Sequence, residues 1–185
     1  MVLKYPQVLS YLGAEINTLT IQNSSFIRNT APKASSIYVE ESALNLVDVS
    51  IKGNTTTTAN GFIFVKNPPQ YDTLHMSITN CVFSENTIEI GLGGIYIETT
   101  GFQVTTSIYV EGAVMSNNKA VQGAAIFVNE VKLSEDSYIR STTFANNEVD
   151  GRSVVFLSFV AGIIKIENNT FENNKGEESC IFISS

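Results

Sequence analysis

The chain has 185 residues, of which 43% are hydrophobic and only 16% are charged, a composition too apolar and too weakly charged for a disordered tail. Eighteen acidic residues against eleven basic ones give a formal net charge of −7, which argues against a nucleic-acid binder because such proteins need a basic face. One domain of this size buries a sufficient core, and the longest apolar run, Phe159 to Ile164, is too short to cross a bilayer as a helix.

A short motif, in which a large apolar anchor is followed three positions later by Asn, recurs along the chain. The steps between successive copies are 25 to 32 residues, and the residues between anchor and Asn vary freely. Such self-similarity is typical of a solenoid, in which each repeat stacks on the next. The anchors are Phe26, Ile51, Phe83, Met115, Phe144 and Phe171. The asparagines are Asn29, Asn54, Asn86, Asn118, Asn147 and Asn174.

Two strands are predicted in each repeat around this motif. Aliphatic residues lie five positions before every anchor and, with Ser137 as one polar exception, seven positions before it. This alternation with a period of two indicates a strand with one buried face. A second strand, with an aromatic residue between two aliphatic ones, begins ten to twelve residues after the anchor. Its aromatic residues are Tyr38, Phe64, Tyr96, Phe127, Phe156 and Phe182.

The predicted fold is an all-β, right-handed parallel β-helix of about six coils of 25 to 32 residues, with two or three strands per coil. No apolar period of 3.6 residues continues for three turns, so no helix is expected. Residues 1–185 form a single domain in this interpretation, with 1–18 as an incomplete first coil and 19–183 as six repeats. Turn-rich insertions are expected at Asn67–Gln70 and Thr99–Gly101.

The motifs resemble the repeats of the chlamydial polymorphic outer membrane proteins, within the wider pectin-lyase-like group. Phe-x-x-Asn at 26, 83, 144 and 171 matches one half of that signature, and Gly93-Gly94-Ile95 matches the other. Gly123-Ala124-Ala125-Ile126 is a near match, whereas Ile51 and Met115 replace the Phe and most coils lack the double glycine. The resemblance covers residues from about 19 to 183 and implies the β-helix fold, with adhesins and other surface proteins among its members.

In a stack of coils each repeated position becomes a column. The Asn column is predicted to form a ladder, because a primary amide both donates and accepts hydrogen bonds. A second polar column lies three residues before each anchor and reads Asn23, Asp48, Asn80, Gly112, Ser141 and Asn168. The Asn-x-Ser/Thr tripeptides at Asn23, Asn54 and Asn168 fall in these two columns, so burial of the columns would leave them unglycosylated.

The aromatic column has two interpretations. Strand alternation sends the six rings away from the core if the flanking aliphatic residues point inward. They then form either a stabilising ladder or an exposed apolar strip that binds sugar rings, a neighbouring chain or another part of the same protein. The inverted facing, with the rings inside the core, remains a further alternative.

One outward column carries candidate catalytic groups. Glu111 and Glu167 are two coils apart, about 10 Å at their backbones, near the carboxylate separation of inverting glycosidases, with Arg140 between them. The alternative is an ion ladder of alternating charge. The single His75 is expected on the surface, and Cys81 and Cys180 are expected to be buried and too far apart for a disulfide. No metal-binding or cofactor motif is present in the sequence.

These observations favour a non-catalytic structural or adhesive module of an extracellular or cell-surface protein. Its expected partners are other copies of itself, stacked head to tail into filaments, or adjacent coils of a longer chain, together with glycans or a host or matrix surface. Met1–Pro6 lacks the apolar stretch of a signal peptide, so the chain is either not exported or part of something longer. The alternatives are a polysaccharide-acting enzyme that uses Glu111 and Glu167, and a carbohydrate-binding module that uses the aromatic column.

Overall fold

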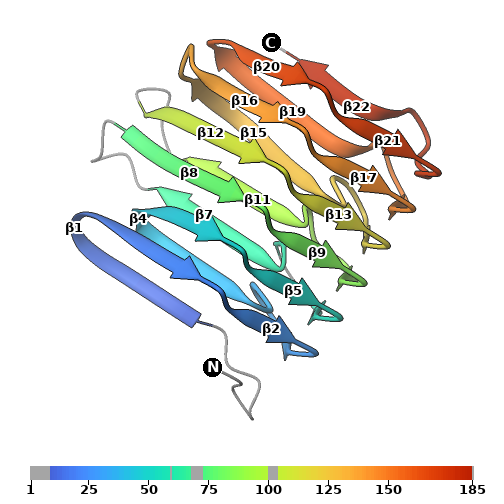
Figure 1. Ribbon diagram of the computed structural model, residues 1–185, viewed down its shortest axis with the longest axis horizontal. Coiled ribbons are helices and arrows are strands. Elements are labelled where there is room, and N and C mark those ends of the chain that lie inside the picture. The colour runs from blue at the N-terminus through green and yellow to red at the C-terminus, as the bar shows by residue number, and fades with distance from the viewer. Residues whose placement is uncertain (1–8, 59, 68–72, 100–103, 185) are drawn as a thin grey trace.

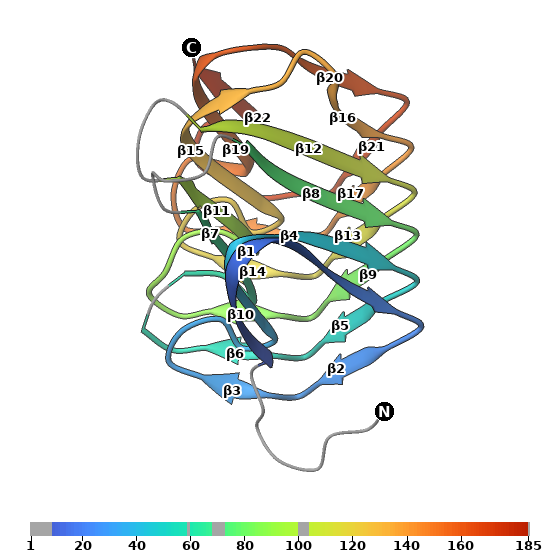
Figure 2. The ribbon, with the colours of Figure 1, turned by 90° about the vertical axis from the view of Figure 1, so that its left-hand side faces the viewer.

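The computed structural model describes residues 9–58, 60–67, 73–99 and 104–184. Within these ranges the chain is a parallel β-helix in which strands stack rung upon rung and no helix occurs (Figure 1). Figure 2 shows the rungs in succession, from β2 and β3 at one end to β20 and β22 at the other. The predicted fold class is therefore confirmed.

Three parallel sheets run along the stack. The largest is bent into two arms, and the strand β4 (Ile37–Val47) passes from one arm to the other, as does β1 (Leu9–Gln22), which pairs with β4. We call the first the aromatic arm; its strands are β7 (Ile63–Asn67), β11 (Ile95–Thr99), β15 (Ile126–Leu133), β19 (Ser153–Ala161) and β22 (Ser179–Ser184). We call the second the charged arm; its strands are β8 (Thr73–Thr79), β12 (Thr105–Glu111), β16 (Ser137–Arg140) and β20 (Ile164–Glu167).

The two smaller sheets close each turn. The six-stranded sheet contains the anchors and comprises β2 (Ser25–Ile27), β5 (Ser50–Lys52), β9 (Val82–Ser84), β13 (Val114–Ser116), β17 (Thr143–Ala145) and β21 (Thr170–Glu172). The five-stranded sheet follows the asparagines and comprises β3 (Thr30–Ala31), β6 (Thr55–Thr56), β10 (Thr87–Ile88), β14 (Lys119–Ala120) and β18 (Glu148–Val149). A full turn such as β11 to β14 thus has four short strands rather than two or three, because a two-residue strand follows each Asn.

The strand register reproduces the predicted columns. Phe26 pairs with Ile51, and the pairing continues through the remaining anchors to Phe171. The aliphatic column from Ile21 to Ile166 is also in register. Ser137, the polar exception, is fully buried, but its hydroxyl accepts a hydrogen bond from the Ile108 backbone nitrogen at 3.2 Å. Like therefore stacks on like, and the exception is satisfied locally.

The incomplete first coil contains a strand of its own. Residues 9–12 pair with 37–40, so that Ser10 takes the place of an aromatic residue beside Tyr38. Residues 1–8 and most of the predicted insertions at 67–70 and 99–101 lie outside the described residues. The repeats therefore start one half-turn earlier than residue 19.

Each coil has two corners at which one residue adopts the left-handed backbone conformation. The first corner follows the charged arm and coincides with the second polar column, at φ values of 48° to 64°. The second precedes the ladder Asn and includes Arg28, Gly53 and Glu85. L residues other than Asn and Asp adopt this region at a cost of roughly 1 kcal/mol or more, so its recurrence marks turns that the stack imposes. Asn and Gly, which tolerate it best, occupy many of these positions.

Candidate functional site

The asparagine ladder is confirmed in its full predicted length. From Asn54 to Asn174, each Asn Oδ1 accepts a hydrogen bond from the backbone nitrogen of the Asn one coil earlier, as in Asn86 N to Asn118 Oδ1 at 3.1 Å. The Asn118 Nδ2 donates both to Asn147 Oδ1 at 3.1 Å and to the Phe83 carbonyl at 2.9 Å. Five of the six side chains are buried, and Asn174 is half-buried. This column holds the turns together and presents no group for a ligand.

The aromatic column is a stacked ladder on the outer side of the aromatic arm. Neighbouring ring centroids lie 4.7 to 5.4 Å apart from Tyr38 to Phe182, and the stack is nearly parallel at Phe127, Phe156 and Phe182. The rings point away from the main core, as strand alternation predicts. They form a separate apolar cluster with Ala34 and Leu92.

The interpretation of this column as an exposed, sugar-binding strip is wrong. Phe64, Tyr96, Phe127 and Phe156 are all 9% exposed or less, and only the end rings Tyr38 and Phe182 are half-buried. The reason is that the backbone leading into each strand folds over the ring column. A Cβ on Gly93 would lie 2.5 Å from the Phe127 Cβ, and one on Gly123 would lie 2.8 Å from it. Small residues before the strand are therefore required by the rings beneath them.

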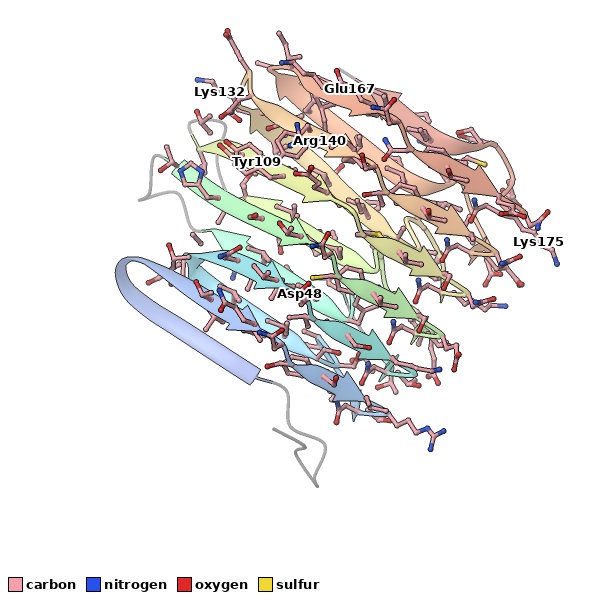
Figure 3. All side chains as sticks on the ribbon, viewed as in Figure 1. Asp48, Tyr109, Lys132, Arg140, Glu167 and Lys175 are labelled. Carbon is pink, nitrogen blue, oxygen red and sulfur yellow. The ribbon has the colours of Figure 1, made fainter. Side chains whose placement is uncertain are left out.

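The predicted catalytic row does come together, on the outer face of the charged arm. Glu111, Arg140 and Glu167 are in register on β12, β16 and β20. Figure 3 shows Arg140 and Glu167 on the same side of neighbouring strands, with Tyr109 beside them. The Arg140 Nη2 donates to Glu111 Oε2 at 2.8 Å, and the two side chains remain 43% and 39% exposed. The row therefore lies on an open sheet face.

Two tyrosines and an aspartate, which the sequence analysis did not single out, complete this surface. Tyr109 and Tyr138 are in register, with ring centroids 5.2 Å apart. The Arg140 guanidinium carbon lies 4.3 Å from the centroid of the Tyr138 ring, a cation–π contact. The Tyr109 hydroxyl donates to Asp136 Oδ2, and Ser134 donates to the other carboxylate oxygen. We call these six residues the Tyr–Arg patch: Tyr109, Glu111, Asp136, Tyr138, Arg140 and Glu167.

Hydrogen bonds within the Tyr–Arg patch shift the pKa values of several of its groups. The hydrogen bond from Arg140 keeps the pKa of Glu111 below its usual value, and the same bond raises the pKa of Arg140. The pKa of Asp136 is lowered by hydrogen bonds from Ser134 and Tyr109. Burial and then the bond to Asp136 raise the pKa of Tyr109. The patch contains three acidic side chains, Glu111, Asp136 and Glu167, and one guanidinium, Arg140.

The direction of the pKa shift of Glu111 does not fit the role of a general acid. A glycosidase general acid needs a carboxyl group whose pKa is raised, so that it keeps a proton near neutral pH. Glu111 has the opposite shift, because its partner is a cation. Tyr and Arg side chains, in contrast, are the residues most enriched where proteins make strong contacts with partners.

The other predicted residues fall as follows. His75 is exposed, as expected for a surface histidine. Both cysteines are free; Cys81 is buried as predicted, but Cys180 is exposed because it lies on β22, in a rung that no further described coil covers. Among the described residues no three His, Cys, Asp or Glu side chains cluster as metal ligands would. No helix that could cross a membrane occurs in the part of the chain that the structure describes.

Comparison of the chain with models of protein families, with curated proteins and with solved structures finds no match. The resemblance to the chlamydial surface-protein repeats therefore stays a prediction from the Phe-x-x-Asn and Gly-Gly-x-Ile motifs.

Proposed function

We propose that this chain is a non-catalytic structural and adhesive module of an extracellular or cell-surface protein. The β-helix would act as a stiff support, and the Tyr–Arg patch would be the surface that contacts a partner. The observation that carries the proposal is the contrast between two kinds of residue. The asparagine and aromatic columns repeat from coil to coil and are largely buried in ladders, whereas the Tyr–Arg patch occurs only in the later coils and faces solvent.

The chemistry of the patch favours a protein partner. Tyrosine and arginine supply large contact areas with polar ends. The three acidic side chains of the patch outnumber its cations, Arg140 and the neighbouring Lys165, which is in register with Tyr138, by one. A complementary partner surface would carry basic side chains and hydrogen-bond donors. A glycan is the alternative ligand, favoured by the pair of tyrosine rings 5.2 Å apart.

The test compares two pairs of residues in one outward column of the charged arm. Tyr109 and Tyr138 stand in the same outward column as Asn45 and Ser77 on the preceding coils. The variant Tyr109→Ala/Tyr138→Ala is expected to lose adhesion to cells, matrix proteins or immobilised glycans, while the matched control Asn45→Ala/Ser77→Ala keeps it. Equal adhesion by the two double variants would refute the assignment of the patch.

The enzymatic alternative has its own experiment. Incubation with acidic and neutral polysaccharides is expected to release no reducing ends beyond background. Release that disappears in Glu111→Gln would instead establish a polysaccharide hydrolase and contradict the non-catalytic proposal. Glu167→Gln serves as the second variant, because both carboxylates would be needed.

We extend the proposal to packing of another coil on the rung formed by β20, β21 and β22, from a second copy or from a longer chain. Ile183 continues the inward column of Leu157 but is 49% exposed, and Ile163, directly before β20, is 52% exposed. If a second copy packs there, electron microscopy of the chain at high concentration would show filaments. Ile183→Lys is expected to abolish them, and monodisperse short rods from the unaltered chain would remove the filament version.

A further inference from the structure

The three Asn-x-Ser/Thr tripeptides lie in two different environments. Asn54 is a ladder residue with no exposed surface, and its Nδ2 donates to the Phe26 carbonyl and to Asn86 Oδ1, both at 3.0 Å. Thr56, the hydroxyl residue of the same tripeptide, is also fully buried. The expected burial is therefore confirmed for Asn54. It is wrong for Asn23 and Asn168, which are both exposed.

The corner geometry explains this exposure. Asn23 and Asn168 occupy the first corner of their coils, where the backbone is left-handed with φ values of 48° and 54°. This corner lies between the charged arm and the anchor sheet. Its backbone is bonded to the next rung, as in Asn23 N to the Val47 carbonyl at 3.1 Å, but the two Asn side chains are exposed. The hydroxyl residues of the two tripeptides, Ser25 and Thr170, are exposed at the first positions of β2 and β21.

We infer that Asn23 and Asn168 are acceptors for N-linked glycans and that Asn54 is not. The inference rests on the proposed extracellular location, because N-glycans are added to chains entering the secretory route. The donor is an oligosaccharide carried on a polyprenyl diphosphate. The Asn Nδ2 attacks the anomeric carbon, the carbon–oxygen bond to the diphosphate breaks, a carbon–nitrogen bond forms, and the amide loses one proton as the polyprenyl diphosphate leaves.

Folding decides which of these acceptors can persist in the native protein. A glycan on Asn54 would replace an amide hydrogen that the ladder uses and would need space where the side chain has none. Asn23 and Asn168 lie in the same column five coils apart, about 24 Å along the stack. Asn168 directly follows Glu167, so its glycan would stand at the border of the Tyr–Arg patch rather than beneath it.

The experiment directs the full chain into the secretory pathway of a eukaryotic cell with an added, cleavable signal, and analyses the secreted, protease-resistant protein. Intact mass before and after treatment with an N-glycan-releasing amidase counts the glycans. The amidase leaves aspartate at each occupied site, which peptide mass spectrometry then locates. We expect two glycans, on Asn23 and Asn168, and an unmodified Asn54.

Matched variants separate glycosylation from folding. Ser25→Ala and Thr170→Ala each remove one tripeptide but keep the corner Asn, and each is expected to lose one glycan without loss of secretion. Asn80 occupies the same corner column but lacks a tripeptide, and Val82 is an exposed outward residue of β9. Val82→Thr supplies the missing hydroxyl and is expected to add a third glycan, on Asn80.

A secreted chain without a glycan on Asn23 or Asn168, or with one on Asn54, overturns the inference, as does a Val82→Thr chain that gains none. Because the added signal routes the chain, these results do not depend on where the natural protein resides. The extracellular location is tested separately by surface labelling of the producing cell, and its failure would leave the acceptor result intact.

Discussion

Replacing one rung of the asparagine ladder tests the role of this column most sharply. In Asn118→Ala the backbone nitrogen of Asn86 loses the acceptor that it reaches at 3.1 Å, and the Phe83 carbonyl loses the donor at 2.9 Å. Asn86 Nδ2 keeps its bond to the Ile51 carbonyl, and Asn147 Oδ1 keeps its bond to the Asn118 backbone. The Asn86 backbone nitrogen is thus left buried without a partner, at about 1 to 3 kcal/mol, whereas the Phe83 carbonyl keeps its place in the β9–β13 pairing.

The expected loss in the free energy of unfolding is therefore about 1 to 3 kcal/mol, measured by urea denaturation with an unchanged slope. The matched control is Asn45→Ala, a half-exposed position of β4 on the outer face, expected to change stability by no more than about 0.5 kcal/mol. Equal midpoints for the two variants would refute the reasoning, because the ladder would then contribute no more than a surface amide.

The charge variant of the same residue adds a pH signature. Asn118→Asp keeps the acceptor for Asn86 but replaces the amide group, so an oxygen faces the Phe83 carbonyl and Asn147 Oδ1. We expect the pKa of this buried carboxyl to lie above its unfolded value of about 3.9. The destabilisation relative to the unaltered chain should therefore grow as pH rises from 4 to 7. A pH-independent difference would contradict it.

Three further predictions concern the aromatic and charged arms. Gly93 and Gly53 have similar left-handed φ values, +72° and +65°. The Cβ of Gly93→Ala would lie 2.5 Å from the Phe127 Cβ, whereas that of Gly53→Ala would meet its nearest atom at 3.4 Å. Calorimetry should therefore show the larger loss of thermal stability for Gly93→Ala. Burial raises the pKa of Tyr96 to about 12, so its contribution to stability is present below about pH 10 and is lost between pH 10 and 12. The melting temperature of Tyr96→Phe should fall less over this range, and equal falls for the variant and the unaltered chain would refute this. Arg140→Met should raise the pKa of Glu111 in an NMR titration, and an unchanged pKa would show that the ion pair is not populated.

Repeated positions were the part of the fold that sequence could predict. The anchors, the aliphatic column and the ladder asparagines each recur in all six coils, so a column is visible before any coordinates exist. Parallel stacking then follows, because identical amides satisfy one another only in register. Ser137 could not be explained in advance, since its hydrogen-bond partner lies one coil away.

Features that depend on what lies over a strand could not be predicted. Alternation gave the outward direction of Phe127 but not its burial, which depends on the glycine-containing segment that folds across it. The exposure of Asn23 depends on a left-handed corner rather than on its column alone. Tyr109 and Tyr138 occupy one column in only two coils, so no repeat marks the Tyr–Arg patch in the sequence. It is defined by the pairing of β12 with β16.

The stacking of like residues is tested most directly by nuclear Overhauser contacts between backbone protons of the anchor strands. The account predicts parallel contacts of Met115 with Phe83 on one side and with Phe144 on the other. Antiparallel contacts, or pairing of Met115 with residues outside the repeat spacing, would contradict it.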